Sequence, residues 1–272
     1  MLARAALGDE PEADAVRRLA STPETLEGAL GNRAVYTALF RSERGDPLLT
    51  VSAFLVFAVA VHRGAQDLAR AGSVSEWVGP GRRLPVLDVE RLRAFLATAA
   101  HRLFLAELLA SYTHVGSGAL YVQSHRGWRR HRYSELDPVR FASLIELVPE
   151  GERPGIYRRL GDLALFLTGV FPDYSATYWT SPVHAQRLAR TLPGDLGPDI
   201  DEGDSATLEL FEELGRGWYK AACATAPRPP SARLRLVASV ADHFSEARRV
   251  LNFIAERYIF PHRSRWFGAT SG

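Results

Sequence analysis

The sequence predicts a predominantly α-helical protein, with one compact multi-helix domain over residues 1–272, a loose segment at 1–20 and one inserted β-hairpin near 119–133. Three observations predict this class. Between Leu163 and Phe171 only Thr168 and Gly169 are not hydrophobic, apolar residues elsewhere recur at three- and four-residue steps, and one stretch alone changes to a shorter period. A helix that is apolar on nearly every side is a buried one. We therefore expect the segment 156–174 to lie at the centre of the protein.

The central segment has two distinct sides. Apolar residues at three- and four-residue steps form one helical face, which begins after Pro154 and ends before Pro172: Ile156, Leu160, Leu163, Leu167 and Val170. The other side carries Gly161 and Gly169, each of which costs a helix roughly 1 kcal/mol relative to alanine. Close approach of a neighbouring backbone would offset that cost. Asp162 follows Arg158 and Arg159 by one turn, which fits a local ion pair or a buried polar anchor for a ligand.

Two stretches resemble blocks of a family of uncharacterised bacterial helical proteins. The first reads YRRLGDLALFLTGVFPDY and contains a Gly-Asp-x-x-Leu-Phe-Leu-x-Gly-x-Phe pattern; the second, ELGRGWYKAA at Glu213–Ala222, carries a Gly-x-x-x-Tyr pattern. The resemblance covers the C-terminal half at most. It implies an all-helical fold and no assigned activity, so it supplies no catalytic residues.

Composition limits the class of protein. With 272 residues, of which 46% are hydrophobic and 24% charged, the chain has ample material for a core. The single cysteine, Cys223, excludes an internal disulfide and any cysteine-based metal cage, and it favours a reducing compartment. The formal charge of +2 is small, so global electrostatics do not indicate a nucleic-acid partner.

The chain is predicted to be soluble and cytoplasmic, without a membrane segment. The first fourteen residues include four acidic ones and no uninterrupted apolar run of the kind found in a secretory signal. The longest apolar run, Leu48–Val61, has 14 residues and is shorter than the ~20 that cross a bilayer. We interpret it as part of a buried helix.

The N-terminal half is predicted to be helical as far as Val115. Expected helices cover Glu12–Ala20, Pro23–Leu30 with Thr22 as its cap, Arg33–Arg41, a segment beginning at Asp46-Pro47, and Val89 to about Val115 with Asp88 as its cap. The last of these would be about 40 Å long at ~1.5 Å per residue. Between the last two helices, Gly72–Pro85 is predicted to be a loop whose Trp77 contacts the core.

The second half resumes the helical pattern after the predicted hairpin. Expected elements are a helix over Val139–Val148 capped by Asp137, the central helix, a turn-rich stretch at 172–181, and helices over 182–192, 205–224 and 231–259, with an acidic loop at 193–204. Apolar residues keep helical steps through the last helix, from Val237 to Tyr258. This continuous stripe predicts a surface for a homo-oligomer along 231–259.

Motifs for metal or nucleophilic chemistry are missing from the sequence. Paired Glu-x-x-His motifs do not occur, and His243 with Glu246 fits a solvated pair on one helix face. There is no Gly-x-Ser-x-Gly, no phosphate-binding Gly-x-x-x-x-Gly-Lys and no dinucleotide fingerprint. Cys223 lies in Ala-Ala-Cys-Ala, the setting of a packing residue. The sequence therefore predicts no metal and no cofactor, and it leaves open whether the protein is an enzyme.

The strongest local signal is the basic and aromatic stretch 125–133, in which six of nine residues are arginine or histidine. Arginine binds phosphate or carboxylate in a bidentate manner, and tryptophan offers a stacking face. The candidate anion- or nucleic-acid-binding residues are Arg126, Trp128, Arg129, Arg130 and Arg132. Strand alternation would place Trp128, Arg130 and Arg132 on one face and Arg129 on the other. The alternative is a charged edge that resists strand pairing, with intramolecular ion pairs.

Three functions therefore stay open. The first is a non-catalytic binding or scaffold protein. The second is binding of an anionic ligand or nucleic acid through the hairpin, to which a second basic and aromatic piece at 261–267 could add. The third is a small-molecule enzyme with a pocket near the central helix, lined by Asp162, Tyr157, Tyr174, Tyr178, Trp218 and Tyr219.

Overall fold

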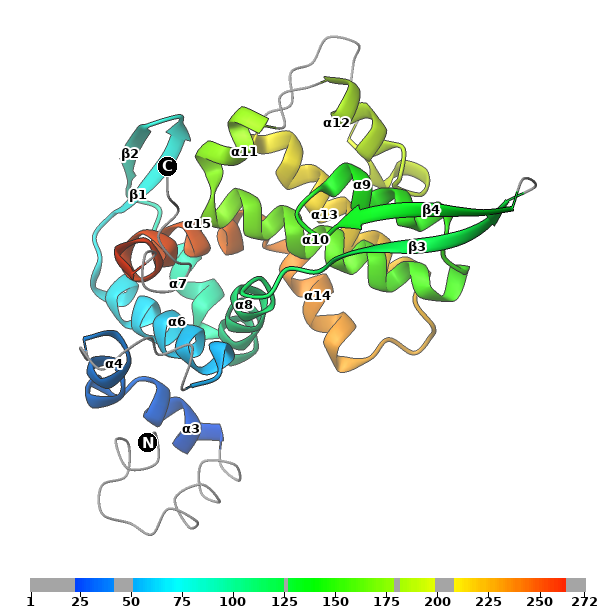
Figure 1. Ribbon diagram of the computed structural model, residues 1–272. Helices are drawn as coiled ribbons and strands as arrows, with labels where there is room; N and C mark the ends of the chain where they lie inside the picture. The colour runs from blue at the N-terminus through cyan, green and yellow to red at the C-terminus, as the bar shows by residue number, and fades with distance from the viewer. Residues whose placement is uncertain (1–22, 42–50, 125–126, 179–181, 199–207, 263–272) are drawn as a thin grey trace. The chain divides into compact units, whose positions relative to one another are not determined.

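The computed structural model describes residues 23–41, 51–124, 127–178, 182–198 and 208–262 (Figure 1). These residues form a predominantly helical protein with two small two-stranded sheets, which confirms the predicted class. The chain divides into two compact units, each assembled from separate stretches of sequence. Unit 1 contains the described parts of Met1–Val74, Val86–Thr113 and Phe253–Gly272, and unit 2 contains those of Ser75–Pro85 and His114–Asn252.

Unit 1 is built around α6 (Ala53–Arg70). Helices α3 (Pro23–Leu30) and α4 (Arg33–Phe40) confirm two predictions. The predicted start of this helix at Asp46-Pro47 is wrong, because α6 begins at Ala53. The Ser52 side chain caps it by accepting a hydrogen bond from the Leu55 amide. Its apolar face also continues beyond His62 to Leu68. Gly64 lets Ile254 approach α6, since a Cβ at this glycine would lie 2.9 Å from the isoleucine side chain.

The single long helix predicted over 89–115 is wrong. The chain forms α7 (Glu90–Ala97) and α8 (Ala99–Ser111), whose axes differ by 89° at Thr98. Side chains satisfy the last carbonyls of α7, because Arg102 donates to Leu96 O at 2.5 Å and to Ala97 O at 3.0 Å. Periodicity cannot reveal such side-chain capping. The predicted cap at Asp88 is also wrong, because the N-cap position is Val89.

Arg102 also joins three helices of unit 1. Its Nη2 lies 2.6 Å from a Glu27 carboxylate oxygen on α3, and its Nε donates to His62 Nε2 on α6 at 3.3 Å. The His62 Nδ1 in turn lies 2.9 Å from Ala58 O, so this ring nitrogen is the donor and Nε2 the acceptor. Burial lowers the pKa of His62, with the charge of Arg102 acting in the same direction.

None of the described helices alone is long and apolar enough to cross a membrane; one bent pair, α7 with α8, meets that test of length and composition when its two helices are taken together.

The predicted loop at 72–85 is instead a β-hairpin, made of β1 (Val74–Gly79) and β2 (Arg82–Val86). The turn uses Gly79 and Gly81, both with positive φ. Periodicity missed the strands because β2 is exposed at nearly every position and buried residues of β1 lie three apart. Trp77 does contact the core as predicted, since its Nε1 donates to the Asp173 carboxylate at 2.7 Å.

The second hairpin confirms the predicted insertion near 119–133. Strands β3 (Ser117–Ser124) and β4 (Gly127–Ser134) pair antiparallel, with Tyr121 opposite Arg130 and Ala119 opposite Arg132. The Asp137 side chain then caps α9 (Pro138–Ala142) by accepting from the Arg140 amide at 3.0 Å. The predicted helix to Val148 is too long, because α9 tightens into the 3₁₀ turn η1 (Ser143–Glu146), and a separate 3₁₀ turn, η2 (Glu150–Glu152), follows after residues 147–149.

The central helix of unit 2 is α10 (Arg153–Val170), which confirms the prediction for 156–174 up to Val170. Twelve of its residues are buried. It lies beside α13 (Leu208–Thr225), as Figure 1 shows. A Cβ at Gly161 would lie 2.4 Å from the Tyr219 ring, so the glycine is what admits this ring. The close neighbour at Gly161 is therefore a side chain and not the predicted backbone, whereas a Cβ at Gly169 would lie 3.3 Å from the backbone carbonyl oxygen of Arg248.

The elements after α10 differ from the prediction in two places. Pro172 begins another helix, α11 (Pro172–Tyr178), where a turn-rich stretch was predicted, because proline fits the first turn of a helix as well as the end of one. Helix α12 (Pro182–Ala189) and η3 (Gly194–Leu196) follow. The helix predicted over 231–259 is also interrupted: α14 (Ala232–Asp242) ends at His243, and α15 (Phe244–Ile254) leads into the π-turn η4 (Ala255–Ile259) and the 3₁₀ turn η5 (Phe260–His262).

The break at His243 places the Phe244 ring on α13, where a Cβ at Gly215 would lie 2.4 Å from it. The apolar stripe of this segment is buried within the chain itself: Val237, Val240, Phe244, Ala247, Leu251, Ile254 and Tyr258. A homo-oligomer through 231–259 stays a prediction, and it would have to use other side chains of this segment. The predicted helix at 12–20, the cap at Thr22, most of the acidic loop and the piece 263–267 lie outside the described residues.

Candidate functional site

The β3–β4 hairpin has an inner face that is attached to α9 and η1. Strand alternation places His131 and Tyr133 on this face. The His131 Nε2 lies 2.8 Å from Ser143 Oγ, and the Tyr133 ring packs against Phe141 with centroids 6.4 Å apart. These contacts fix the base of the hairpin to the helices of unit 2.

The outer face of the hairpin, which we define by Ala119, Tyr121, Arg130 and Arg132, has no such attachment. Both arginines are exposed, and Tyr121 is 64% exposed. Within the described chain, neither arginine has a hydrogen bond or ion pair. The sequence 117–134 contains no aspartate or glutamate that could pair with them. The outer face therefore carries positive charge that the protein does not neutralise locally.

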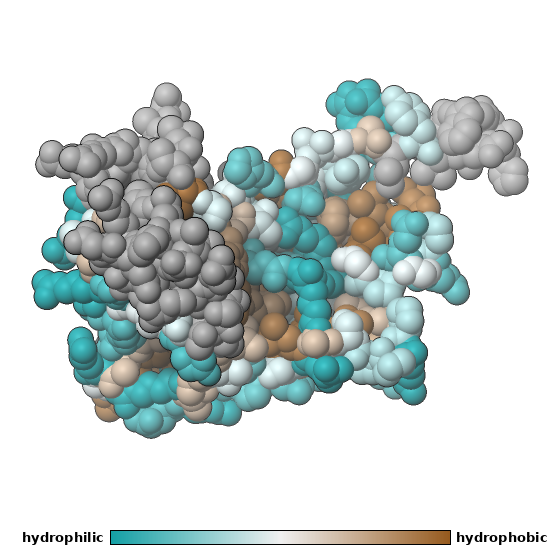
Figure 2. All heavy atoms as spheres, turned by 90° about the horizontal axis from the view of Figure 1, so that it is seen from below, coloured by the Kyte–Doolittle hydropathy of each residue, from teal (hydrophilic) through white to brown (hydrophobic). Residues whose placement is uncertain are grey.

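The nearest carboxylate along the chain, Glu135, is engaged at the base of the hairpin. One of its oxygens lies 3.0 Å from Arg159 Nη2 and accepts from the Gly116 amide at 3.1 Å. It therefore joins the two strand ends to α10. Figure 2 shows hydrophilic and hydrophobic residues intermixed on the face of the molecule that it views.

The other predicted hairpin residues are only partly visible. Arg126 lies outside the described residues, and Trp128 and Arg129 are described by their backbone positions on β4 alone. Of the five predicted anion-binding residues, the structure therefore brings Arg130 and Arg132 together on one exposed face.

Asp162 and Tyr219, two predicted pocket residues, form a buried pair. The Tyr219 hydroxyl donates to Asp162 Oδ1 at 2.8 Å, and Arg158 Nε lies 3.8 Å from Asp162 Oδ2. Burial raises the pKa of Asp162, while Arg158 and the hydrogen bond from Tyr219 oppose that rise. The local ion pair predicted for Asp162 is present, and the Tyr219 ring fills the space above Gly161.

Tyr157 and Trp218 meet at a third residue, Thr191. The Tyr157 hydroxyl donates to the Thr191 carbonyl at 3.2 Å, and Trp218 Nε1 donates to Thr191 Oγ1 at 3.1 Å. Sequence reasoning did not single out Thr191. Tyr174 is exposed, and Tyr178 ends α11 with its side chain outside the description. The four buried candidates thus hold one another and the surrounding helices together.

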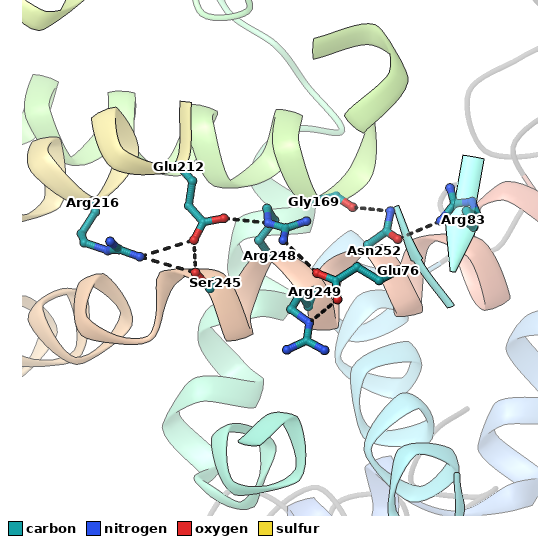
Figure 3. A network of polar contacts seen from close by, with 9 residues as sticks. All are labelled: Glu76, Arg83, Gly169, Glu212, Arg216, Ser245, Arg248, Arg249 and Asn252. Carbon is teal, nitrogen blue, oxygen red and sulfur yellow. Dashed lines mark hydrogen bonds and ion pairs between the residues drawn. The ribbon is translucent and has the colours of Figure 1, made fainter. Parts of the chain in front are cut away.

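A polar cluster in unit 2, shown in Figure 3, joins five elements: β1, β2, α10, α13 and α15. At its centre Arg248 on α15 lies between two carboxylates: its Nε donates to Glu212 on α13 at 2.8 Å, and its Nη2 donates to Glu76 on β1 at 3.2 Å. The second oxygen of Glu76 lies 3.1 Å from Arg249 Nε. Both Glu212 and Arg248 are buried.

A neutral side chain and an arginine extend this cluster at each end. Ser245 donates to Glu212, which Arg216 also contacts at 3.3 Å. At the other end, Asn252 donates to the Gly169 carbonyl at 3.3 Å and accepts from Arg83 at 2.9 Å. Because a buried charge is costly unless it is paired, this arrangement fixes β1–β2 against α10, α13 and α15.

Sequence reasoning missed this cluster. The only local signal was the four-residue spacing of Glu212 and Arg216 on one helix face. The contact between Glu76 and Arg248 joins residues 172 positions apart, which no local pattern can reveal.

The remaining candidates for chemistry have structural contacts. Burial raises the pKa of the Cys223 thiol, whose sulfur lies 3.5 Å from Leu234 O. His243 Nδ1 lies 2.9 Å from Ser239 O. Over the described part of the chain, no three histidine, cysteine or acidic side chains are grouped so that they could hold a metal ion.

In comparisons with known proteins, no family model matches this chain, and neither a curated protein nor a solved structure matches it.

Proposed function

We propose that this chain is a non-catalytic binding protein that contacts a polyanionic ligand through the outer face of the β3–β4 hairpin. The observation that carries the proposal is the pair of exposed arginines, Arg130 and Arg132, which lack a partner among the described residues. Arginine presents a planar fork of donors that matches phosphate and carboxylate oxygens. Two such forks on one face form a small, uniformly positive surface.

The contrast with the interior supports this proposal. The buried carboxylates Asp162 and Glu212 each have partners within unit 2, and so do the arginines that contact them. Such interior ion pairs serve packing and specificity of the fold. The outer face of the hairpin, in contrast, carries positive charge that is available to a ligand.

Protection of strand edges is the competing explanation for these arginines. Both strands of a two-stranded sheet are edges, and charged side chains resist pairing with another chain. Edge protection requires only that charge lies along the strand, whereas a binding face requires that the charge binds an anion. The two explanations therefore predict different results when polyanion binding is measured.

Retention on immobilised heparin tests the proposal. The double variant Arg130→Ala with Arg132→Ala should elute at clearly lower salt than the unmodified protein, because polyanion binding depends on such contacts and is screened by salt. The matched control is Arg187→Ala with Arg190→Ala on and just after α12, which removes the same charge from two other exposed arginines. Equal elution of both double variants would reject the hairpin as the binding site.

A further inference from the structure

We infer that the ligand of the outer face is a single-stranded nucleic acid, with Tyr121 stacking on a base while Arg130 and Arg132 contact the phosphates. This inference rests on the proposed function and narrows its ligand. It starts from the position of the exposed aromatic ring relative to the two arginines.

The strand register places Tyr121 directly opposite Arg130. Side chains opposite one another in an antiparallel pair lie on the same face, with Cβ atoms about 4.5–5.5 Å apart. The ring and the guanidinium are therefore neighbours on the outer face. Arg132 lies two residues along the same strand, about 7 Å from Arg130 at the usual rise of a strand.

The fourth member of the outer face is small. Ala119 lies opposite Arg132 and two residues before Tyr121 on β3. Because its side chain is only a methyl group, Ala119 does not cover the Tyr121 ring, and Tyr121 is 64% exposed. A planar group can therefore approach this ring while an anion contacts the arginines.

An exposed ring beside arginines distinguishes among polyanions. In a duplex the bases already stack on one another, so a tyrosine would have to displace a neighbouring base. A single strand offers base faces without that cost, and stacking on an aromatic side chain contributes about 1–3 kcal/mol per base. A sulfated polysaccharide has no aromatic face. Of these ligands, a single strand is the one that uses both features of the outer face.

The test compares three probes and three proteins by fluorescence anisotropy. The probes are a labelled oligothymidylate, its duplex with oligoadenylate, and the oligothymidylate in competition with heparin; the proteins are the unmodified chain, Tyr121→Ala and Tyr121→Phe. We expect Tyr121→Ala to weaken binding of the single strand by about 5- to 150-fold, the range that stacking on one base gives. Tyr121→Phe keeps the ring and should bind like the unmodified protein.

The remaining probes separate the possible outcomes. Heparin binding should not respond to Tyr121→Ala, because this ligand has no base to stack. If Tyr121→Ala leaves single-strand binding unchanged, or if the unmodified protein prefers the duplex, the inference is overturned while polyanion binding stands. If no probe binds, the proposed function fails as well. Circular dichroism spectra of the variants should match that of the unmodified protein, since Tyr121 lies on the exposed outer face.

Discussion

The two hairpins of this protein carry similar residues and use them differently. On β1–β2, Glu76, Trp77 and Arg83 all contact helices of unit 2. On β3–β4, the inner face is attached to α9, but Arg130 and Arg132 on the outer face have no partner in the described chain. An arginine of the first hairpin therefore forms a contact that supports the fold, whereas the two arginines on the outer face of the second hairpin are exposed charges.

The difference shows that the surroundings of an arginine decide its role. Arg83 meets the Asn252 side chain, and Arg248 meets both Glu76 and Glu212. No carboxylate occurs in the sequence of β3–β4 to engage Arg130 in that way. Substitutions in the first hairpin and its cluster should therefore change stability, and those on the second should change binding.

The largest effect is expected for Glu212→Ala. It removes one of the two carboxylates that pair with the buried Arg248 guanidinium, and breaking a buried ion pair in this way costs about 3–5 kcal/mol. Chemical denaturation measures the change in the free energy of unfolding. Glu209→Ala, an exposed position on the same helix, is the control and should change it little. Equal stabilities of the two variants would mean that the cluster does not anchor β1–β2.

A smaller loss is expected for Trp77→Phe. The substitution keeps an aromatic ring but removes the Nε1 donor to Asp173, so the free energy of unfolding should fall by about 1 kcal/mol. The Asp173 carboxylate also accepts from the Gly81 amide at the turn. Hydrogen exchange at Gly81 should accelerate in this variant. Unchanged exchange there would show that the turn is held by other contacts.

His62 in unit 1 should make the stability of the protein depend on pH. The pKa of His62 in the folded protein lies below its ordinary value of 6.5. The unfolded chain therefore takes up a proton first as pH falls, so stability is complete above about pH 6.5 and declines below it. Protonation of His62 would also remove the nitrogen that accepts the hydrogen bond from Arg102 Nε. The negative charge of Glu27 acts in the opposite direction on the pKa of His62.

Unfolding measured from about pH 7.5 to about pH 5 should show this decline, and His62→Gln should reduce its slope. Because the decline comes from proton uptake by His62, the stabilities of the unmodified protein and His62→Gln should differ in pH dependence mainly at the acidic end of this pH range. Parallel curves for both proteins would assign the decline to other groups.

The smallest effect on stability is expected for Arg130→Ala with Arg132→Ala. Surface substitutions away from packed or paired groups change the free energy of unfolding by about 0.5 kcal/mol or less. Thermal and chemical denaturation should therefore give nearly the same stability as the unmodified protein. A loss as large as that of Trp77→Phe would show that these arginines support the hairpin, and it would remove the contrast between the two hairpins.

Local patterns predicted several elements correctly because their signals lie within a few residues. The apolar run from Leu163 onward indicated a buried helix, and Asp137 with Pro138 marked a helix start. The glycines of that helix also predicted a close neighbour, which is Tyr219 at Gly161. The stretch around Arg130 indicated a hairpin, which β3 and β4 form.

Other features depend on contacts between distant residues. The bend at Thr98 is stabilised by Arg102, which also contacts α3 and α6. The apolar residues keep a helical period on both sides of Thr98, so the sequence pattern did not reveal the bend. Only the folded chain brings Glu76 to Arg248 and places Trp77 beside Asp173.

The sequence by itself determined the helical class, the buried central helix and the charge of the second hairpin, because side-chain periodicity and composition are local properties. The tertiary structure alone decided which charges are paired between distant parts of the chain. Pairing depends on which side chains meet across large separations in the chain, and in this protein it leaves Arg130 and Arg132 exposed while Arg248 is buried between two carboxylates.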